Sequence, residues 1–146
     1  MMENKVKLSQ WDALLLEGLR RLGWSDDEVL QRVRERDDLP ADDSIYQFDY
    51  AQLADFAAAN PELFESAVKN GYAIKYNTVR GIRSWINVTY AQEPELVLEE
   101  GNESVIASLT PAEHERLLSV LSFGWNVREE DPGEAGVYRI EPIQRF

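Results

Sequence analysis

Apolar residues in the first 70 positions recur at helical spacing. The segment from about Ser9 to Leu22 carries one apolar face, made of Leu8, Trp11, Leu15, Leu19 and Leu22. Ser9 and Ser25 each lie three residues before an acidic residue, which is typical of a helix N-cap. Asp49 and Asn60-Pro61 have the composition of two further helix starts. The pattern therefore predicts about four helices over residues 1–70.

Gly18 lies in the middle of the first predicted helix. Glycine costs about 1 kcal/mol relative to alanine inside a helix. We therefore expect another element to approach closely at this position.

After Gly71 the apolar period changes from helical to alternating. Tyr72, Ile74 and Tyr76 alternate with Ala73 and Lys75, which is typical of a half-buried strand. A short helix is predicted over Thr78–Ile86 and a longer one from Thr110 to about Phe123, where Thr110-Pro111 with Glu113 is the clearest helix start. The predicted extended segments are Val88–Tyr90, Leu96–Leu98, Val105–Leu109, and a final hairpin of Trp125–Arg128 and Val137–Ile140 around Asp131-Pro132-Gly133.

A glycine followed by a large aromatic residue comes after a helix-like segment three times: Gly23-Trp24, Gly71-Tyr72 and Gly124-Trp125. Glycine adopts the left-handed conformation that ends helices, and an apolar residue after it packs on the last turn. All three pairs are therefore predicted to be helix C-caps.

These elements predict an α+β fold for residues 1–146 as a single domain. A helical half covers residues 1–70, and an α/β half over residues 71–146 holds a small antiparallel or mixed sheet with two helices. The order of strands and helices in the second half matches a ferredoxin-like βαββαβ arrangement with an added C-terminal hairpin. A looser α+β sheet is the alternative, because the first helix of that unit is short.

The composition narrows the function classes. The chain has 146 residues, 44% of them hydrophobic, so it can bury an ordinary core. A net charge of −12 disfavours nonspecific binding to duplex DNA or to an anionic membrane. The absence of cysteine excludes disulfides, Cys-ligated metals and thiol catalysis. No apolar run approaches the ~20 residues of a membrane span, and the N-terminus lacks a signal-peptide pattern. We expect a cytoplasmic protein without a cofactor.

One segment carries a net positive charge because it contains no acid. Residues 66–92 contain four bases and no acid, whereas the stretches on either side each carry a net charge of −8. Arginine, aromatic rings and a helix N-terminus are parts of anion sites, nucleic-acid contacts and protein hot spots. The predicted partner-binding residues, within segment 69–90, are Lys69, Lys75, Tyr76, Arg80, Arg83 and Trp85. The alternative is that these bases form internal ion pairs with the acidic flanks.

Other candidate sites have simpler interpretations. The helix pair at the N-terminus resembles a DNA-reading motif in outline, but its second helix begins with Asp26-Asp27-Glu28, which would repel phosphates. The acidic loop from Asp37 to Ser44 lacks the spacing of an EF-hand and is interpreted as a solvated loop. His114, the only histidine, is interpreted as a residue at the edge of the core.

The sequence favours a non-enzymatic interaction or regulatory protein that acts by binding a macromolecular partner, in the first place another protein. An inhibitor is one role that would suit it. A nucleic-acid or nucleotide-binding protein using segment 69–90 is the first alternative. An enzyme of unrecognised type, using His114 with a carboxylate, is the second. A homodimer is expected if the final hairpin leaves an exposed sheet edge.

Overall fold

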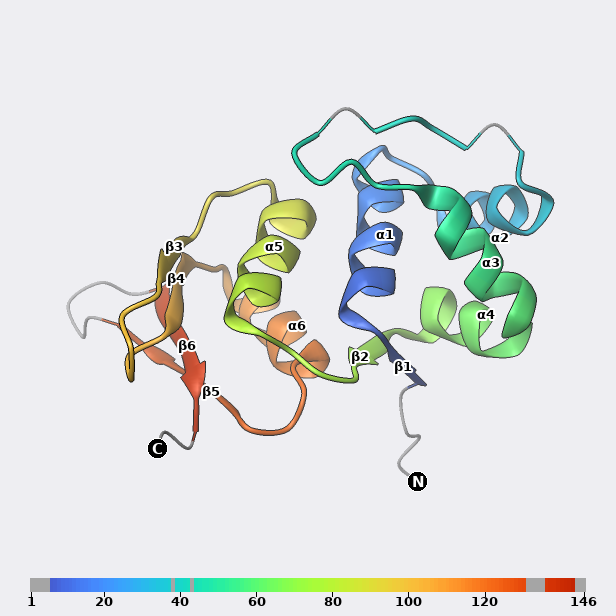
Figure 1. Ribbon diagram of the computed structural model, residues 1–146. Coiled ribbons are helices and arrows are strands. Elements are labelled where there is room, and N and C mark those ends of the chain that lie inside the picture. Colours follow the sequence, from blue (N-terminus) through green and yellow to red (C-terminus); the bar gives the residue numbers. More distant parts are fainter. Residues whose placement is uncertain (1–5, 38, 43, 131–135, 144–146) are drawn as a thin grey trace, which may run out of the picture. The chain divides into compact units, whose positions relative to one another are not determined.

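The structure is a computed structural model that describes residues 6–37, 39–42, 44–130 and 136–143 (Figure 1). The chain divides into two compact units, Met1–Ala73 and Ile74–Phe146. The expected boundary between a helical and an α/β half lies three residues before this division, while the single-domain organisation stays a prediction. In the described residues, no helix combines the length and the apolar content needed to cross a lipid bilayer.

Unit 1 contains the four predicted helices. They are α1 (Gln10–Arg21), α2 (Asp26–Glu35), α3 (Tyr50–Ala59) and α4 (Pro61–Asn70). The Ser9 and Ser25 hydroxyls accept hydrogen bonds from the backbone N–H groups of Asp12 and Glu28, at 3.0 Å and 3.2 Å. These bonds satisfy donors that have no partner inside the helix, which confirms both predicted N-caps.

A short parallel strand pair was not predicted. Strand β1 (Val6–Leu8) pairs with β2 (Tyr72–Ile74) in a two-stranded parallel sheet. The strand at Tyr72 was predicted from its alternating apolar residues and is confirmed as β2. Its partner β1 was missed, because three residues give no detectable alternation and the parallel pairing joins segments far apart in sequence.

Gly18 provides the close approach that was expected. A Cβ atom at this position would lie 2.6 Å from the Tyr50 hydroxyl oxygen and 3.3 Å from the Phe48 ring. Glycine therefore lets the segment around Phe48 and Tyr50 pack directly against the α1 backbone.

Glu17 is a buried acidic side chain of this unit. Glu17 is only 3% exposed, and its carboxylate accepts hydrogen bonds from the Tyr72 hydroxyl at 2.7 Å and from Arg20 Nη1 at 3.1 Å. Arg20 also donates to the Val68 carbonyl oxygen at 2.8 Å. The network ties α1 to the end of α4 and to β2.

The acidic loop is organised by Asp42. Its carboxylate accepts hydrogen bonds from the Ser44 hydroxyl and from the backbone N–H of Phe48, at 2.6 Å and 2.8 Å. Burial acts to raise the pKa of Asp42, but the hydrogen bonds outweigh it and hold the pKa below its ordinary value. Asp42 thus joins two positions of the loop that precedes α3, Ser44 and Phe48.

Tyr50 should ionise late in an alkaline titration. Burial, helped by the Asp42 charge, raises the pKa of Tyr50 to about 12. The folded state therefore holds this proton more tightly than the unfolded chain does. The contribution of Tyr50 to the free energy of unfolding is fully present below pH ~10, and about 2–3 kcal/mol of it is lost as pH rises to ~12. In the absorbance titration of tyrosinate, Tyr50→Phe should remove a step near pH 12. An unchanged late step would contradict the assignment, and Asp42→Asn should move the step downward.

Unit 2 pairs two helices with a four-stranded antiparallel sheet. Its elements are α5 (Val79–Tyr90), β3 (Glu95–Val97), β4 (Ser104–Ser108), α6 (Pro111–Val120), β5 (Trp125–Glu129) and β6 (Val137–Pro142). The strand order is β3-β4-β6-β5. The α+β class is confirmed, and α5 packs against β3 and β4.

The ferredoxin-like order is not found in the described residues. That order needs the strand at Tyr72 in the main sheet, but β2 pairs with β1 instead. The extended segment predicted at Val88–Tyr90 is also wrong, because α5 continues to Tyr90. Its β-branched residues lie on a helix that packs on the sheet, so burial outweighs their strand propensity.

The predicted start of α6 is confirmed, but its predicted end is wrong. Thr110 and Glu113 form a complete capping box, with reciprocal bonds of 3.2 Å and 2.9 Å. The helix ends at Val120, three residues before Phe123. Gly124, at φ +103°, is therefore part of the turn into β5 and does not cap a helix. The predicted turn at Asp131-Pro132-Gly133 lies outside the described residues.

Candidate functional site

The predicted binding residues are distributed over both units. Lys69 lies near the end of α4 in unit 1. The remaining five residues lie in unit 2, where Lys75 and Tyr76 form the bend after β2 and the other three belong to α5: Arg80, Arg83 and Trp85.

Trp85 does not lie on the surface and is a correction to the predicted site. Its side chain is 1% exposed and makes an edge-on contact with the Tyr90 ring, at 5.5 Å between centroids. The Arg116 guanidinium lies over the same ring, 5.2 Å from its centroid. Trp85 falls on the face of α5 that packs into the unit, so it stabilises the fold and cannot offer its ring to a partner.

Three bases of unit 2 are available to a partner. Lys75 and Arg80 are exposed and Arg83 is half-buried. Among the described residues, none of these three forms an ion pair. Arg128 and Arg139 differ, because they pair with Glu141 and Glu130 at 2.8 Å and 2.6 Å. Positive charge at the start of α5 is therefore not neutralised by described acidic side chains.

Arg139 is an example of a base in this unit that forms an internal ion pair, with Glu130. Arg139 donates to both carboxylate oxygens of Glu130, at 2.6 Å and 2.8 Å, and to the Ser104 hydroxyl at 2.6 Å. The hydrogen bond from Arg139 is the main cause that holds the pKa of Glu130 below its ordinary value. These side chains join neighbouring strands, so we assign them a structural role.

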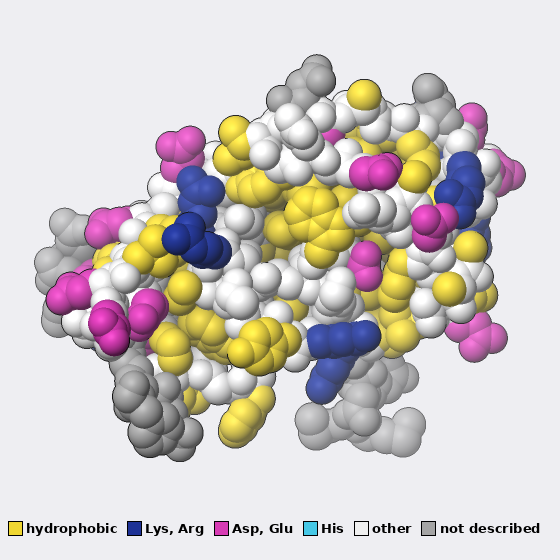
Figure 2. Space-filling view, in the orientation of Figure 1, with side chains coloured by type: hydrophobic (Ala, Val, Ile, Leu, Met, Phe, Trp, Pro, Cys, Tyr) yellow, Lys and Arg dark blue, Asp and Glu magenta, His cyan; other side chains and the backbone are white. Residues whose placement is uncertain are grey.

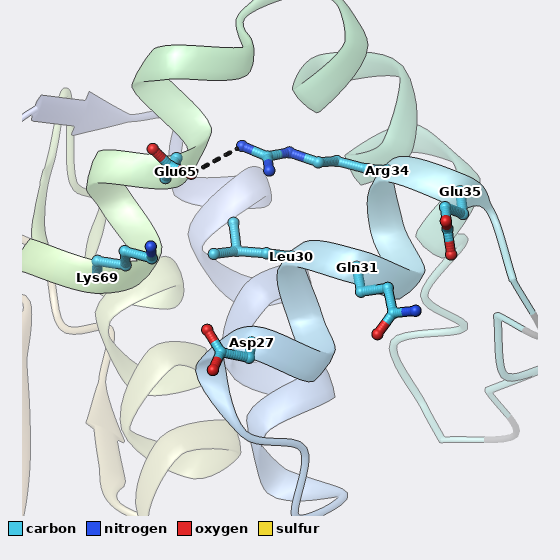
Figure 3. A pocket seen from close by; sticks show the side chains of 7 residues that line it. All are labelled: Asp27, Leu30, Gln31, Arg34, Glu35, Glu65 and Lys69. Carbon is cyan, nitrogen blue, oxygen red and sulfur yellow. Dashed lines mark hydrogen bonds and ion pairs between the residues drawn. The ribbon is translucent and has the colours of Figure 1, made fainter.

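Lys69 has a different setting, in a surface groove of unit 1. The groove has a volume of about 370 Å³ and lies between α2 and α4 (Figure 3). Lys69 points toward Leu30, and Arg34 of α2 pairs with Glu65 of α4 at 3.2 Å. Asp27 and Glu35 add negative charge to the lining. Arg34 and Glu65 are both substantially exposed, so this mixed-charge groove is typical of a solvated helix pair.

Two exposed apolar residues near Tyr76 were missed by sequence reasoning. Phe123 is fully exposed, Tyr76 is 76% exposed and Ile143 is 61% exposed. Phe123 was assigned to a helix end, where apolar residues pack inward, and Ile143 belongs to no periodic segment. The only sequence signal was a large apolar residue directly before Gly124.

Tertiary hydrogen bonds bring these three residues to one end of unit 2. The backbone N–H of Asn77 donates to the Ser122 hydroxyl at 3.2 Å, and the backbone N–H of Ser122 donates to Asn77 Oδ1 at 2.6 Å. The Ile143 backbone N–H donates to the Gly124 carbonyl oxygen at 2.8 Å. Each exposed residue is thus next to a residue that is fixed to another segment.

We call this region the Tyr76–Phe123 surface and define it as Lys75, Tyr76, Arg80, Phe123 and Ile143. Figure 2 shows hydrophobic side chains gathered around the connection between α6 and β5. Asn77 is 5% exposed, so the link beneath the surface is buried and the loops that carry the aromatic residues are anchored. The surface combines exposed aromatic side chains on anchored loops with bases that form no ion pair among the described residues.

His114 and the acidic residues were the other chemical candidates. The His114 ring stacks on Tyr138, with centroids 4.2 Å apart and planes inclined by 8°. Within the described ranges, no group of three or more His, Cys, Asp or Glu side chains is arranged to hold a metal ion. His114 therefore takes part in ring stacking with Tyr138 and in a local backbone hydrogen bond to Thr110.

Comparisons with known proteins add no relative. No known family, no curated protein and no solved structure matches this chain.

Proposed function

We propose that this protein is a non-enzymatic binding protein that engages another protein through the Tyr76–Phe123 surface. The observation that carries the proposal is the full exposure of Phe123 beside the exposed Tyr76, on loops held by the Asn77–Ser122 bonds. Exposed apolar groups that gather on one surface typically mark interaction sites. Aromatic residues on anchored loops bind at low entropic cost, which is why they are enriched among hot spots.

A regulatory or inhibitory role, a cytoplasmic location and a homodimer remain parts of this proposal. Strand β5 lies at one edge of the four-stranded sheet, and an edge strand can pair with another chain, which supports a dimer through the last hairpin. A second copy is therefore one partner that a capture experiment must recognise, by the mass of the captured band.

The proposal is tested by capture from the source lysate with tagged protein, before and after nuclease treatment. We expect a protein band that survives nuclease, and we expect Phe123→Ser to reduce it by at least about tenfold, because truncating a hot-spot residue costs 2 kcal/mol or more. Since Phe123 is fully exposed, this change should leave folding intact.

Leu98→Ser is the matched control, because Leu98 is another exposed apolar residue of unit 2, 47% exposed, next to β3. It should leave the captured band unchanged. Equal capture by the wild-type protein and Phe123→Ser would contradict the proposed surface.

A further inference from the structure

We infer that the partner segment bound by the Tyr76–Phe123 surface is acidic and carries apolar side chains, as in a short acidic protein segment. This inference rests on the proposed function and specifies the chemistry of the partner.

The charge of the surface carries the first step. Lys75 and Arg80 are exposed and form no ion pair with any described residue. Arg83 lies three residues after Arg80 and therefore on the same face of α5. A carboxylate from a partner would pair with these bases without breaking an ion pair within the described part of the chain. In a chain of net charge −12, such unpaired bases offer local complementarity to an acidic group.

The apolar part of the surface carries the second step. Phe123 and Ile143 present apolar side chains to solvent, at positions fixed by the bonds to Ser122 and Gly124. Burying such groups against a partner gains about 25 cal/mol per Å² of apolar area. A purely charged ligand would leave this area exposed, so the matching segment needs apolar side chains between its acids.

A protein segment fits better than a nucleic acid. A single-stranded nucleic acid carries one phosphate per nucleotide, and its binding sites combine a basic groove with successive stacking rings. Here the bases are few, Ile143 is not a stacking group, and the remainder of the chain is strongly acidic. Repulsion by a chain of net charge −12 penalises a polyanion more than a short segment with a few carboxylates, and physiological salt screens this repulsion beyond about 8 Å.

Direct titration with defined probes tests this inference. The full-length protein is titrated by fluorescence anisotropy with a short synthetic peptide in which Asp and Glu alternate with Leu and Phe. Three comparison probes are the same peptide with Lys in place of every acid, the same peptide with Ser in place of every apolar residue, and a single-stranded oligo-dT. We expect the acidic, apolar peptide to bind most tightly.

Charge-reversal variants localise the binding. Lys75→Glu combined with Arg80→Glu should lower the affinity for the acidic, apolar peptide by at least about tenfold. Phe123→Ser should lower it by a similar factor. The control pair Lys7→Glu with Lys69→Glu changes the net charge by the same amount in unit 1 and should have a much smaller effect.

Each contrary result has a defined meaning. Equal weakening by the two charge-reversal pairs, tighter binding of the Lys-containing peptide, or tighter binding of oligo-dT would overturn the acidic-segment inference. If lysate capture still depends on Phe123 in these cases, the proposed function stands with a different partner chemistry. If Phe123→Ser alters neither capture nor peptide binding, both proposals fail.

Discussion

Replacing Trp85 with alanine should lower the free energy of unfolding of unit 2 by about 3–5 kcal/mol, the range for truncating a buried aromatic residue. Trp85 is 1% exposed and contacts Tyr90 and Arg116, so alanine would leave a cavity and remove both ring contacts. Urea unfolding followed by circular dichroism measures the change without relying on tryptophan fluorescence. Because most single domains are stable by only about 5–15 kcal/mol, Trp85→Phe serves as a milder variant with a smaller loss.

Tyr76→Ala is the control for this experiment, because Tyr76 is aromatic, lies in the same unit and is 76% exposed. Its effect on the free energy of unfolding should stay within about 0.5 kcal/mol. A Trp85→Ala variant as stable as Tyr76→Ala would show that Trp85 is not a core residue and would return it to the candidate binding residues.

Replacing Tyr72 with phenylalanine should lower the free energy of unfolding by about 1.5–3 kcal/mol, the range for a hydrogen bond to a charged group. The Tyr72 hydroxyl donates to the carboxylate of Glu17, which is 3% exposed. Phenylalanine keeps the ring but removes the donor, so a buried carboxylate oxygen loses that partner. Denaturant unfolding measures the loss, and Tyr76→Phe, which changes an exposed hydroxyl, should cause almost none.

A double-mutant cycle with Glu17→Gln separates this bond from the general effect of each substitution. Because the two side chains are 2.7 Å apart, we expect a coupling energy of about 0.5–3 kcal/mol. Strictly additive effects of Tyr72→Phe and Glu17→Gln would mean that the bond contributes nothing to stability.

Local interactions explain why much of the secondary structure was predictable. At the N-caps Ser9, Ser25 and Thr110, the hydroxyl accepts a hydrogen bond from the backbone N–H three residues later. Both partners lie in one short stretch of sequence, so the interaction can be predicted from the sequence alone. The predictions failed where distant segments decide. β1 and β2 pair across most of unit 1, and the residues from Val88 to Tyr90 stay helical because α5 packs on the sheet.

The candidate site divides in the same way. The sequence by itself determined that residues 66–92 carry four bases and no acid in an otherwise acidic chain, because charge and residue type do not depend on folding. Only the tertiary structure decided that Trp85 is buried while Tyr76 is exposed, and that Phe123 and Ile143 lie near Tyr76. The physical reason is that exposure depends on which face of each element is packed, and that the bonds from Asn77 to Ser122 and from Ile143 to Gly124 join segments far apart in sequence.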